Sequence, residues 1–490
     1  MSDGKILVLG GTGAIGKYLC ESLIRRGYEV FVTSRREHIG KGKLHYICGN
    51  AKNIKFLNEI FSLYNFDVIF DFMIYNESQF KERYNILLDN CKQYFFSSSQ
   101  RVYADSDDDG WLRENSKRKV DCISENSEWE KDIYGCTKGR EENILFSSKK
   151  KNWTIVRMSM TFSNSRFQFG PLDNFDVVRA MRGQCSALPD TLIDKETTLT
   201  YGKVTAELLS SLVLRDGALA NVFNVGSRYS YTWREIAGIY HKVFGLTYKS
   251  IQEDKYIFAT NTKKIMVDRR LNRKLDCSKI YYFNDNSRIR FELLEDGLTD
   301  AWNEADHKKY INGVGNLDAH TLIDIYTNSV TNQSALNPTI RKKYNVMYKR
   351  MKNLVEKNIY NNNIFCVTDN SHYWNIEKEE EKILISRSKN ILEESHNRWC
   401  SFMPNFELKN NKKYLFKMEF NSSCDTKMLI FSHGYAYNSE KILRYPVNVG
   451  KNIISFSFKL NRTARFLAIT ATDFAPEENI EIQNIELIEM

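Results

Sequence analysis

The stretch KILVLGGTGAIG, residues 5–16, decides the fold of this chain. Its first five residues form a short apolar run, which is typical of a buried parallel strand. Gly10, Gly13 and Gly16 then fall at three-residue spacing, and a helical pattern follows that stops at Gly27. A strand, a glycine turn and a helix bring backbone N–H groups and a positive helix end to one point, which suits a pyrophosphate. The stretch predicts a dinucleotide site; the alternative is a tight turn without a ligand.

The same alternation of apolar strands and helical patterns continues to about residue 245. Strands are expected at 5–9, 28–33, 44–48, 67–72, 93–97, 153–158 and 221–225, with helices between them, for example at 78–91 and 134–148. The span 246–325 is less regular and has a helical stretch near 293–305. Repeated strand–helix alternation predicts an α/β domain of the Rossmann type, a parallel sheet with helices on both faces and a small substrate lobe. We expect this domain to occupy residues 1–330.

The C-terminal part has a different pattern. After a basic, helix-like stretch at 340–357, expected to be part of a linker over 331–363, apolar and polar residues alternate. Examples are Tyr414, Phe416, Met418 and Phe420. Period-two alternation with short turns predicts an antiparallel β-sandwich domain over 364–490. In its strand pattern this segment resembles carbohydrate-binding jelly rolls, and four aromatics are candidates either for stacking on sugars or for the core: Trp374, Trp399, Tyr435 and Tyr437.

Composition narrows the class of protein. A chain of 490 residues with 42% hydrophobic residues is long enough for two or more globular cores. Ten cysteines without a CxxC pair suit a reducing compartment, and the eight histidines show no metal-ligand spacing, so we expect no metal site. No signal peptide or membrane-spanning run is visible, which predicts a cytoplasmic protein. The net charge of +9 indicates either an anionic partner or lysines spread over the surface.

Two segments carry residues suited to chemistry. One is YFFSSSQRVY, residues 94–103, an apolar strand that ends in three hydroxyls; the other is YGCTK, residues 134–138, on a helical pattern. Tyr134 and Lys138 are four residues apart and share one helix face, so the ammonium sits beside the phenol and favours its ionised form. Such a tyrosine can pass a proton to or from a substrate oxygen while a nicotinamide transfers a hydride. A serine hydroxyl at the end of the strand can hold the same oxygen.

The order of these segments resembles the extended short-chain dehydrogenase/reductase family, which includes nucleotide-sugar epimerases, dehydratases and ketoreductases. The resemblance covers about residues 4–300 and rests on GGTGAIG, FFSSSQRVY, YGCTK and VFNVGSRYSYTWREIAGIY. It implies that Ser99 and Tyr134 are catalytic, and that Lys138 is catalytic and binds the ribose. It also implies a nucleotide-sugar substrate, a place in glycan or surface-polysaccharide precursor synthesis, and a homodimer. No membrane partner is expected from the sequence, and a nucleic-acid partner is not favoured because no RNA-binding motif is visible.

The resemblance assigns further residues to cofactor and substrate. Cofactor contacts are expected from Gly10, Gly13, Ala14, Ile15, Gly16, Ser34, Arg35, Asn50, Phe72, Tyr134 and Lys138. Substrate contacts are expected from Ser99, Gln100, Arg157 and Arg166. NAD-preferring members carry an acidic residue after the second strand, where this chain has TSRR, residues 33–36. A hydroxyl followed by guanidinium groups suits a 2′-phosphate, so we expect NADP, with NAD as the alternative.

Other departures bear on the reaction. The 4,6-dehydratase branch has an acidic pair after its catalytic hydroxyl residue, whereas Gln100 and Arg101 follow Ser99 here. This argues against water elimination and leaves an epimerase or a 4-ketoreductase. The pieces FDVIFDFMIYN (66–76) and YTWRE (231–235) resemble an atypical branch that includes plastid RNA-binding relatives. A non-catalytic or RNA-binding Rossmann protein is therefore the alternative function.

Overall fold

The structure is a computed structural model. It describes residues 4–106, 110–260, 262, 268–284, 288–312, 317–329, 336 and 338–356, and in the C-terminal part residues 364–369, 374–379, 382–387, 400–404, 408, 412–433, 439–461, 464, 466–472 and 478–489. The chain divides into two compact units. The first unit comprises Met1–Ile257, Thr262–Gly315 and Ser329–Ala335, and the second comprises Phe258–Asn261, Asn316–Asn328 and Leu336–Met490.

The first unit is built on a seven-stranded parallel sheet in the order β14-β7-β5-β4-β1-β2-β3. Its strands are β1 (Lys5–Leu9), β2 (Glu29–Ser34), β3 (Leu44–Cys48), β4 (Val68–Asp71), β5 (Gln93–Ser99), β7 (Trp153–Met158) and β14 (Asn221–Val225). All seven lie where the sequence predicts them, to within two residues. The central strands are buried on both faces because helices cover both, so their sequences are continuously apolar. The predicted Rossmann-type sheet is confirmed.

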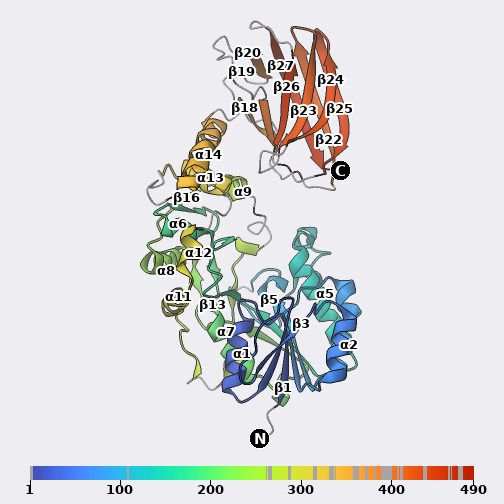
Figure 1. Cartoon of the computed structure of the whole chain (residues 1–490), viewed down its shortest axis with the longest axis vertical. Coiled ribbons are helices and arrows are strands. Elements are labelled where there is room, and N and C mark those ends of the chain that lie inside the picture. Colours follow the sequence, from blue (N-terminus) through green and yellow to red (C-terminus); the bar gives the residue numbers. More distant parts are fainter. Residues whose placement is uncertain are drawn as a thin grey trace. The chain divides into compact units, whose positions relative to one another are not determined.

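Helices cover the two faces of this sheet. Figure 1 shows α1 (Gly16–Arg25) and α7 (Gly202–Ser211) on one side, with α2 (Ile54–Leu63) and α5 (Ile133–Ser147) on the other. On the α2 and α5 side, apolar side chains of the strands and helices form one buried cluster, for example Leu7, Leu57 and Leu145. The single helix expected at 78–91 is instead two short helices, α3 (Glu77–Lys81) and α4 (Tyr84–Asp89). Arg83 separates them with a non-helical φ of −122°, and its buried guanidinium donates to the carbonyl oxygens of Gln79 and Lys52.

Short elements form the smaller lobe of the first unit and the connections around the sheet. The strands are β6 (Trp111–Leu112), β8 (Met160–Phe162), β9 (Gln168–Phe169), β10 (Leu172–Asp173), β11 (Ser186–Pro189), β12 (Glu196–Thr197), β13 (Leu199–Tyr201), β15 (Tyr231–Thr232), β16 (Tyr248–Ile251) and β17 (Lys274–Leu275). The helices are α6 (Phe175–Met181), α8 (Trp233–Phe244), α10 (Ser278–Tyr282), α11 (Leu294–Asn303) and α12 (His307–Asn312). Helix α9 (Glu253–Thr260) begins in the first unit and ends in the second. The helical stretch predicted near 293–305 is α11.

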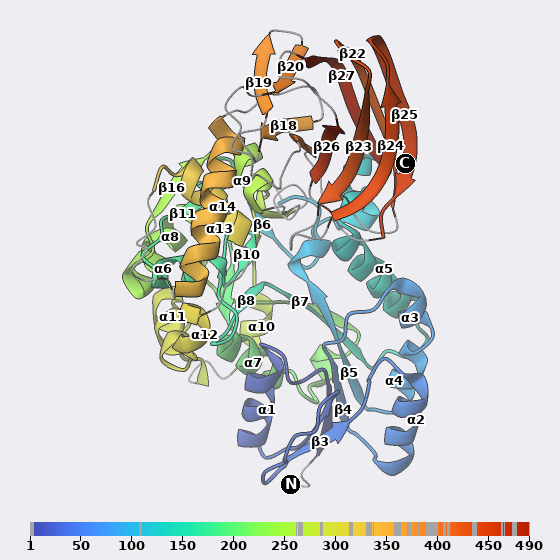
Figure 2. The ribbon, with the colours of Figure 1, turned by 45° about the horizontal axis from the view of Figure 1, so that its top comes forward.

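In the segments that the structure describes, the second unit has two complete helices and two antiparallel sheets (Figure 2). Helix α14 (Pro338–Glu356) packs on α13 (Leu317–Tyr326), so the predicted linker helix groups with the C-terminal unit. One sheet has the order β18-β21-β26-β23-β24 and the other β19-β20-β27-β22-β25. These strands are β18 (Ile364–Asp369), β19 (Trp374–Glu379), β20 (Lys382–Arg387), β21 (Cys400–Pro404), β22 (Lys413–Ser422), β23 (Thr426–His433), β24 (Ser439–Val447), β25 (Gly450–Lys459), β26 (Phe466–Thr472) and β27 (Asn479–Glu489).

The period-two pattern gives the second unit its core. Along β22, Tyr414, Phe416, Met418 and Phe420 are buried and their neighbours are more exposed. They pack against buried side chains of the other sheet, such as Ile430, so two sheets share one core. The predicted β-sandwich is confirmed. The candidate sugar-stacking aromatics Trp399, Tyr435 and Tyr437 and the side chain of Trp374 lie outside what the structure describes.

Across the described segments, no helix is both long enough and apolar enough to span a membrane.

Candidate functional site

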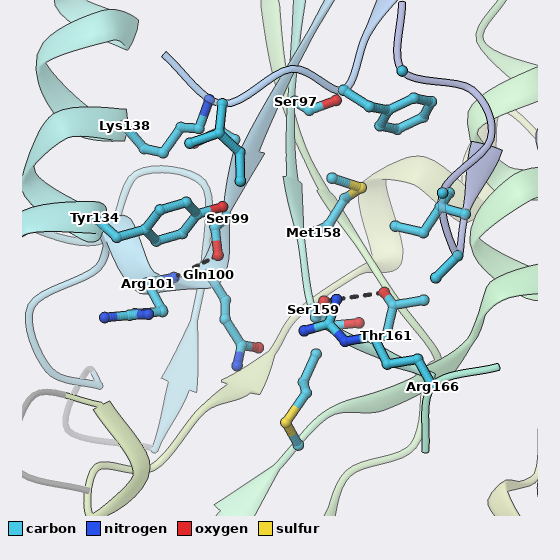
Figure 3. Close-up of a pocket in the computed structure, with 18 of the residues that line it drawn as sticks. Ser97, Ser99, Gln100, Arg101, Tyr134, Lys138, Met158, Ser159, Thr161 and Arg166 are labelled. Carbon is cyan, nitrogen blue, oxygen red and sulfur yellow. Dashed lines mark hydrogen bonds between the residues drawn. The ribbon is translucent and has the colours of Figure 1, made fainter. Parts of the chain in front are cut away.

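A cavity of about 430 Å³ lies at the carboxyl ends of β1, β4, β5 and β7. The strand order changes direction between β1 and β4, and ligands of open parallel sheets bind at such a point. Figure 3 shows α5 side chains entering the cavity on one side and the residues after β7 on another. Most of the predicted site residues line it, namely Gly10, Gly13, Ala14, Ile15, Gly16, Phe72, Ser99, Gln100, Tyr134, Lys138 and Arg166.

The glycine turn after β1 forms one wall of the cavity. Gly10 has a φ of +73°, a left-handed conformation that favours glycine, and its N–H donates to Thr33 Oγ1 at 3.2 Å. A Cβ at Gly16 would lie 2.4 Å from the carbonyl oxygen of Gly11, so the start of α1 also needs glycine. A Cβ at Gly13 would meet nothing closer than the Gly10 oxygen at 3.6 Å. Gly13 is therefore not needed for packing, and its bare backbone leaves room for a phosphate to approach.

Ser99, Tyr134 and Lys138 lie together on the opposite wall (Figure 3). Ser99 is the last residue of β5, and its Oγ accepts a hydrogen bond from the backbone N–H of Arg101 at 3.3 Å. Tyr134 and Lys138 lie on consecutive turns of α5. The N-cap of this helix, Asp132, accepts a hydrogen bond from Gly135 N at 3.0 Å and fixes the first turn, which carries Tyr134. The three residues predicted to be catalytic thus share one cavity.

Arg101 connects the tyrosine with the cap of its helix. Its guanidinium carbon lies 5.1 Å from the centroid of the Tyr134 ring, and its Nε donates to Asp132 Oδ2 at 3.2 Å. Asp132 also pairs with the buried Lys119, whose Nζ is 2.5 Å from Oδ2. Burial, together with the nearby Arg273, lowers the pKa of Lys119 to about 8. A charged network therefore holds the start of α5 against the segment that follows β5.

Lys138 has two buried carboxyl groups beside it. Its Nζ lies 3.0 Å from Glu141 Oε2, one turn further along α5, and 4.5 Å from the centroid of the Phe96 ring. Asp71, the last residue of β4, accepts hydrogen bonds from Met73 N at 3.0 Å, Tyr94 Oη at 2.9 Å and Tyr75 Oη at 3.3 Å. Burial raises the pKa of both Glu141 and Asp71.

Three arginines also line the cavity: Arg101, Arg166 and Arg269. Arg166 is half-exposed, and its Nε donates to Asp173 Oδ2 at 3.0 Å. Arg269 pairs with the fully buried Asp268, but no acceptor in the described part of the chain binds its buried Nε. Burial lowers the pKa of Arg269. Gln100 is buried as well, and its Oε1 has no donor among the described residues. This side of the cavity therefore presents hydrogen-bonding groups suited to an anionic, polar ligand.

Arg157, predicted to bind substrate, lies outside the cavity. Its side chain is 2% exposed, and it forms two hydrogen bonds with Glu142, from Nε at 2.9 Å and from Nη2 at 2.7 Å. Its Nη1 donates to the carbonyl oxygen of Glu114 at 2.9 Å, and its guanidinium stacks on Tyr103. These contacts occupy the guanidinium, so its place in the fold is that of a buried structural ion pair rather than a contact to a ligand. The place of Arg157 near the end of its strand could not predict this ion pair, because its partners Glu142 and Glu114 lie on other segments of the chain.

Three predicted cofactor residues, Ser34, Arg35 and Asn50, also lie outside the residues that line the cavity. Ser34 Oγ accepts from Arg36 N at 3.1 Å, and Asn50 Oδ1 accepts from Lys52 N at 3.0 Å. Arg35 is exposed. Ser34 is the last residue of β2 and Arg35 follows it, whereas Asn50 comes after β3; in the sheet β2 lies beside β1 and β3 beside β2.

Four charged residues at or beside the cavity were not predicted from the sequence: Arg101 and Arg269, which line it, and Asp71 and Glu141, which lie next to Lys138. Asp71 is the last residue of β4 and Arg101 comes two residues after β5, so the strand pattern could have drawn attention to both. Glu141 lies three residues after Lys138, on the same helix face, which is also a signal in the sequence. Arg269 has no such signal, because only the tertiary fold brings it to the cavity.

Comparison with known proteins matches part of the chain to a family. Residues 6–172 match the sequence model of the "NAD dependent epimerase/dehydratase family". The chloroplast stem-loop binding protein of 41 kDa b from Arabidopsis thaliana is a curated relative. It is 24% identical over 323 residues, which cover 62% of this chain and 79% of the relative.

Several solved structures are similar in backbone. The dTDP-glucose 4,6-dehydratase of Bacillus anthracis, in complex with NAD, has 15% identity and a TM-score of 0.48 and covers 62% of this chain and 98% of its own. A human epimerase family protein with NADPH has 14% identity and a TM-score of 0.47, with coverage of 61% and 99%. The UDP-glucose 4-epimerase of Thermus thermophilus, in complex with NAD, has 17% identity and a TM-score of 0.46, with coverage of 61% and 99%. Residues 6–172 are therefore similar in sequence to the NAD dependent epimerase/dehydratase family, in agreement with the family resemblance of the motifs in this part of the chain.

Proposed function

We propose that this protein is an NAD(P)-dependent oxidoreductase that acts on a nucleotide sugar, as an epimerase or a 4-ketoreductase, in the synthesis of a glycan or surface-polysaccharide precursor. One observation carries the proposal. A single cavity has the glycine turn of a dinucleotide site on one wall and Ser99, Tyr134 and Lys138 on the other. The family match of residues 6–172 supports a nicotinamide cofactor.

The residues present fit such a cofactor. The turn at Gly13 leaves space for a pyrophosphate next to the start of α1, where unpaired N–H groups favour an anion. When bound, the nicotinamide takes a hydride from a sugar carbon or gives one to it. Tyr134 then accepts the proton of the sugar hydroxyl or donates one to the carbonyl oxygen. Ser99 holds that oxygen by a hydrogen bond, and the Lys138 ammonium binds the ribose and favours the ionised tyrosine.

NADP is the cofactor that we propose, with NAD as the alternative. Ser34 and Arg35 follow β2, next to β1, and offer a hydroxyl and an exposed guanidinium in place of an acidic residue. A guanidinium binds a phosphate with two hydrogen bonds, whereas a carboxylate at this point would repel it. Asn50 after β3 offers an amide to the adenine.

For the substrate we propose contacts from Ser99, Gln100, Arg101, Arg166 and Arg269. Gln100 Oε1 and Arg269 Nε are buried polar atoms that lack a partner in the described structure, and such atoms are costly unless a ligand satisfies them. The guanidinium groups suit the diphosphate of a nucleotide sugar, which needs several positive donors.

The test is binding and turnover with the purified full chain. The nucleotide that co-purifies with the protein is identified by mass spectrometry, and the affinities for NAD⁺, NADP⁺ and NADPH are measured by calorimetry. UDP- and dTDP-sugars are then assayed for epimerisation by NMR and for NADPH consumption by absorbance. We expect tighter binding of NADP(H) than of NAD(H) and turnover of at least one nucleotide sugar. Failure to bind any nicotinamide nucleotide would contradict the proposal. Light scattering of the same sample tests the expected homodimer.

A second candidate function is RNA binding, which the relative from Arabidopsis thaliana favours, since its name describes a stem-loop binding protein. Helix α14 also carries the exposed cations Lys342 and Lys349 on the side opposite the buried Ile340 and Tyr344, and a third exposed cation, Lys343, between the two sides. RNA affinity that falls steeply with salt, with no turnover of nucleotide sugars, would support this function instead.

A further inference from the structure

The feature that the proposed mechanism does not use is the buried carboxylate of Glu141. Its side chain is fully buried, and its only charged contact in the described structure is the ion pair with Lys138 at 3.0 Å. The contact lacks hydrogen-bond geometry, so neither carboxylate oxygen has a hydrogen-bond donor among the residues described. A buried, incompletely satisfied carboxylate destabilises a fold unless a compensating interaction is present. Stability of the helix therefore does not account for this residue.

The placement of Glu141 relates it to the candidate catalytic face of α5. Tyr134, Lys138 and Glu141 are spaced by four and then three residues, so they lie on one side of the helix on successive turns. Lys138 is the middle one. Its ammonium has three N–H donors, and Glu141 attracts the ammonium from the turn beyond Tyr134. At least one donor can then point to the cavity, which Tyr134 and Lys138 both line.

We propose that Glu141 is a positioning residue for Lys138, which it holds at the cavity wall in the orientation that receives the cofactor ribose. The inference rests on the proposed function, since it names how the lysine of that site is oriented. Lys138 is 3% exposed and lies against the Phe96 ring, so a long flexible side chain is confined to a narrow space. Without the Glu141 carboxylate, the Lys138 ammonium would have no charged partner on this turn of α5. It could then turn towards Asp71 instead of the cavity.

Other ionisable groups face Glu141 and shape its charge. Asp71 at the end of β4 and Glu77 on α3 are negative and disfavour its ionised form, whereas Lys138 favours it. Tyr94 on β5 also senses the charge of Glu141, and its hydroxyl donates to Asp71. Burial raises the pKa of Glu141. Cofactor affinity is therefore expected to decrease as the pH falls and Glu141 takes up a proton.

The first experiment is a double-mutant cycle on cofactor affinity, measured by calorimetry with NADP⁺ and NAD⁺ on the full chain. Glu141→Gln keeps the volume and an acceptor oxygen but removes the charge, and we expect it to weaken cofactor binding about tenfold. In the background of Lys138→Ala the same substitution should have no further effect, because its role passes through the lysine. Glu141→Asp, which keeps the charge on a shorter side chain, should restore part of the affinity. Glu82→Gln, an exposed carboxylate on the α3–α4 turn, is the control that should leave affinity unchanged.

An equal effect of Glu141→Gln with and without Lys138 would overturn the proposal, because a merely structural residue would act independently of the lysine. Full affinity in Glu141→Gln would also overturn it. The loss of affinity should in addition disappear at a pH where Glu141 of the wild type is itself protonated, and a loss that is the same at every pH would argue against the role of the charge.

The second experiment needs no cofactor and separates this inference from the proposed function. The protein is labelled with ¹³C at the glutamate carboxyl groups, and the Glu141 signal is identified by its absence in Glu141→Gln. Lys138→Met should raise the pKa of Glu141 further, because it removes the positive charge that favours the carboxylate. An unchanged titration would overturn the proposal. If this coupling is present but no nicotinamide nucleotide binds to the wild type, the proposed function fails while the ion pair stands.

Discussion

The guanidinium of Arg101 lies over the ring of Tyr134, 5.1 Å from its centroid. The same group pairs with Asp132, the N-cap of the helix that carries the tyrosine. One side chain thus ties the ring, the helix start and the end of β5 together. Gln100 and Arg101 follow Ser99 where the dehydratase branch has an acidic pair. In this chain Arg101 thus serves to hold the tyrosine ring and the start of its helix.

Replacement of Arg101 should impair the orientation of Tyr134. Arg101→Leu removes a cation–π contact of about 0.5–2 kcal/mol, and we expect kcat to fall about tenfold. Steady-state kinetics with a nucleotide sugar that the assays under Proposed function find to be turned over measure the change. Arg140→Leu is the matched control, since Arg140 lies on the same helix and pairs with Glu130 at 3.7 Å on the surface. If kcat fell equally in the two variants, the loss would come from the removal of a positive charge near the helix and not from the contact with the Tyr134 ring.

Tyr134→Phe should abolish turnover while the protein still binds its cofactor. The substitution removes only the hydroxyl, and general acid–base catalysis contributes about 10²- to 10⁴-fold to the rate. We expect kcat to fall by that factor and the cofactor Kd to stay the same. Kinetics and calorimetry on one preparation check both numbers. Wild-type activity in this variant would rule out the proposed mechanism.

The glycine turn offers a pair of substitutions with opposite consequences for folding. A Cβ at residue 16 meets the Gly11 oxygen at 2.4 Å, so Gly16→Ala should lower the melting temperature. At residue 13 the nearest atom is at 3.6 Å, so Gly13→Ala should fold normally. It should nevertheless lose dinucleotide affinity, because the methyl group takes the place of the pyrophosphate. Scanning calorimetry and cofactor titration separate the two effects; undiminished cofactor binding in Gly13→Ala would place the nucleotide elsewhere.

Asp176, on α6, should make stability depend on pH. Burial raises the pKa of Asp176 to about 7, well above its value in an unfolded chain. The folded state therefore holds this proton more tightly, and stability falls as the pH rises from about 4 through 7, by about 1.4 kcal/mol per pH unit at most. The Asp176→Asn side chain cannot ionise. The melting temperature of this variant, relative to that of the wild type, should therefore be higher at pH 8 than at pH 5. Asp89→Asn, at an exposed carboxylate paired with Lys150, is the control and should show no such difference.

The pair Arg157–Glu142 should affect stability and not ligand binding. Both residues are buried, and Ser98 Oγ also donates to Glu142 Oε1 at 2.6 Å. Arg157→Met removes two hydrogen bonds from the buried carboxylate, which keeps Arg118 Nη1 at 3.1 Å as a second cationic partner. We therefore expect a loss of stability smaller than the roughly 3–5 kcal/mol of a buried charge that has lost its whole partner. Denaturant unfolding should show this loss, and the folded fraction should keep its cofactor affinity. If Arg157→Met instead lowered the substrate affinity and left the stability unchanged, Arg157 would be a substrate-binding residue, as the sequence predicts.

Much of this protein can be predicted from its sequence because local patterns carry the information. The seven parallel strands are continuous apolar runs, and the sandwich strands alternate as β22 does, so the class of both units follows from periodicity. The glycine turn and the helical spacing of Tyr134 and Lys138 likewise fix local geometry within a few residues. The break between α3 and α4 is not visible in the local pattern, and Arg83 at the break contacts the carbonyl oxygen of Lys52, which is 31 residues away in the chain.

Only the tertiary structure decides which charged side chains face a ligand and which face each other. Arg157 follows the same kind of strand end as the residues of the cavity, yet Glu142 neutralises it in the interior. Arg269 is far away in sequence and lies in the cavity wall. Burial and pairing depend on what several elements bring to one place, and charges act over distances that no local pattern encodes. The sequence by itself thus determined the sheet, the sandwich and the glycine turn, and the fold decided that Lys138 stands between a cavity and the carboxylate of Glu141.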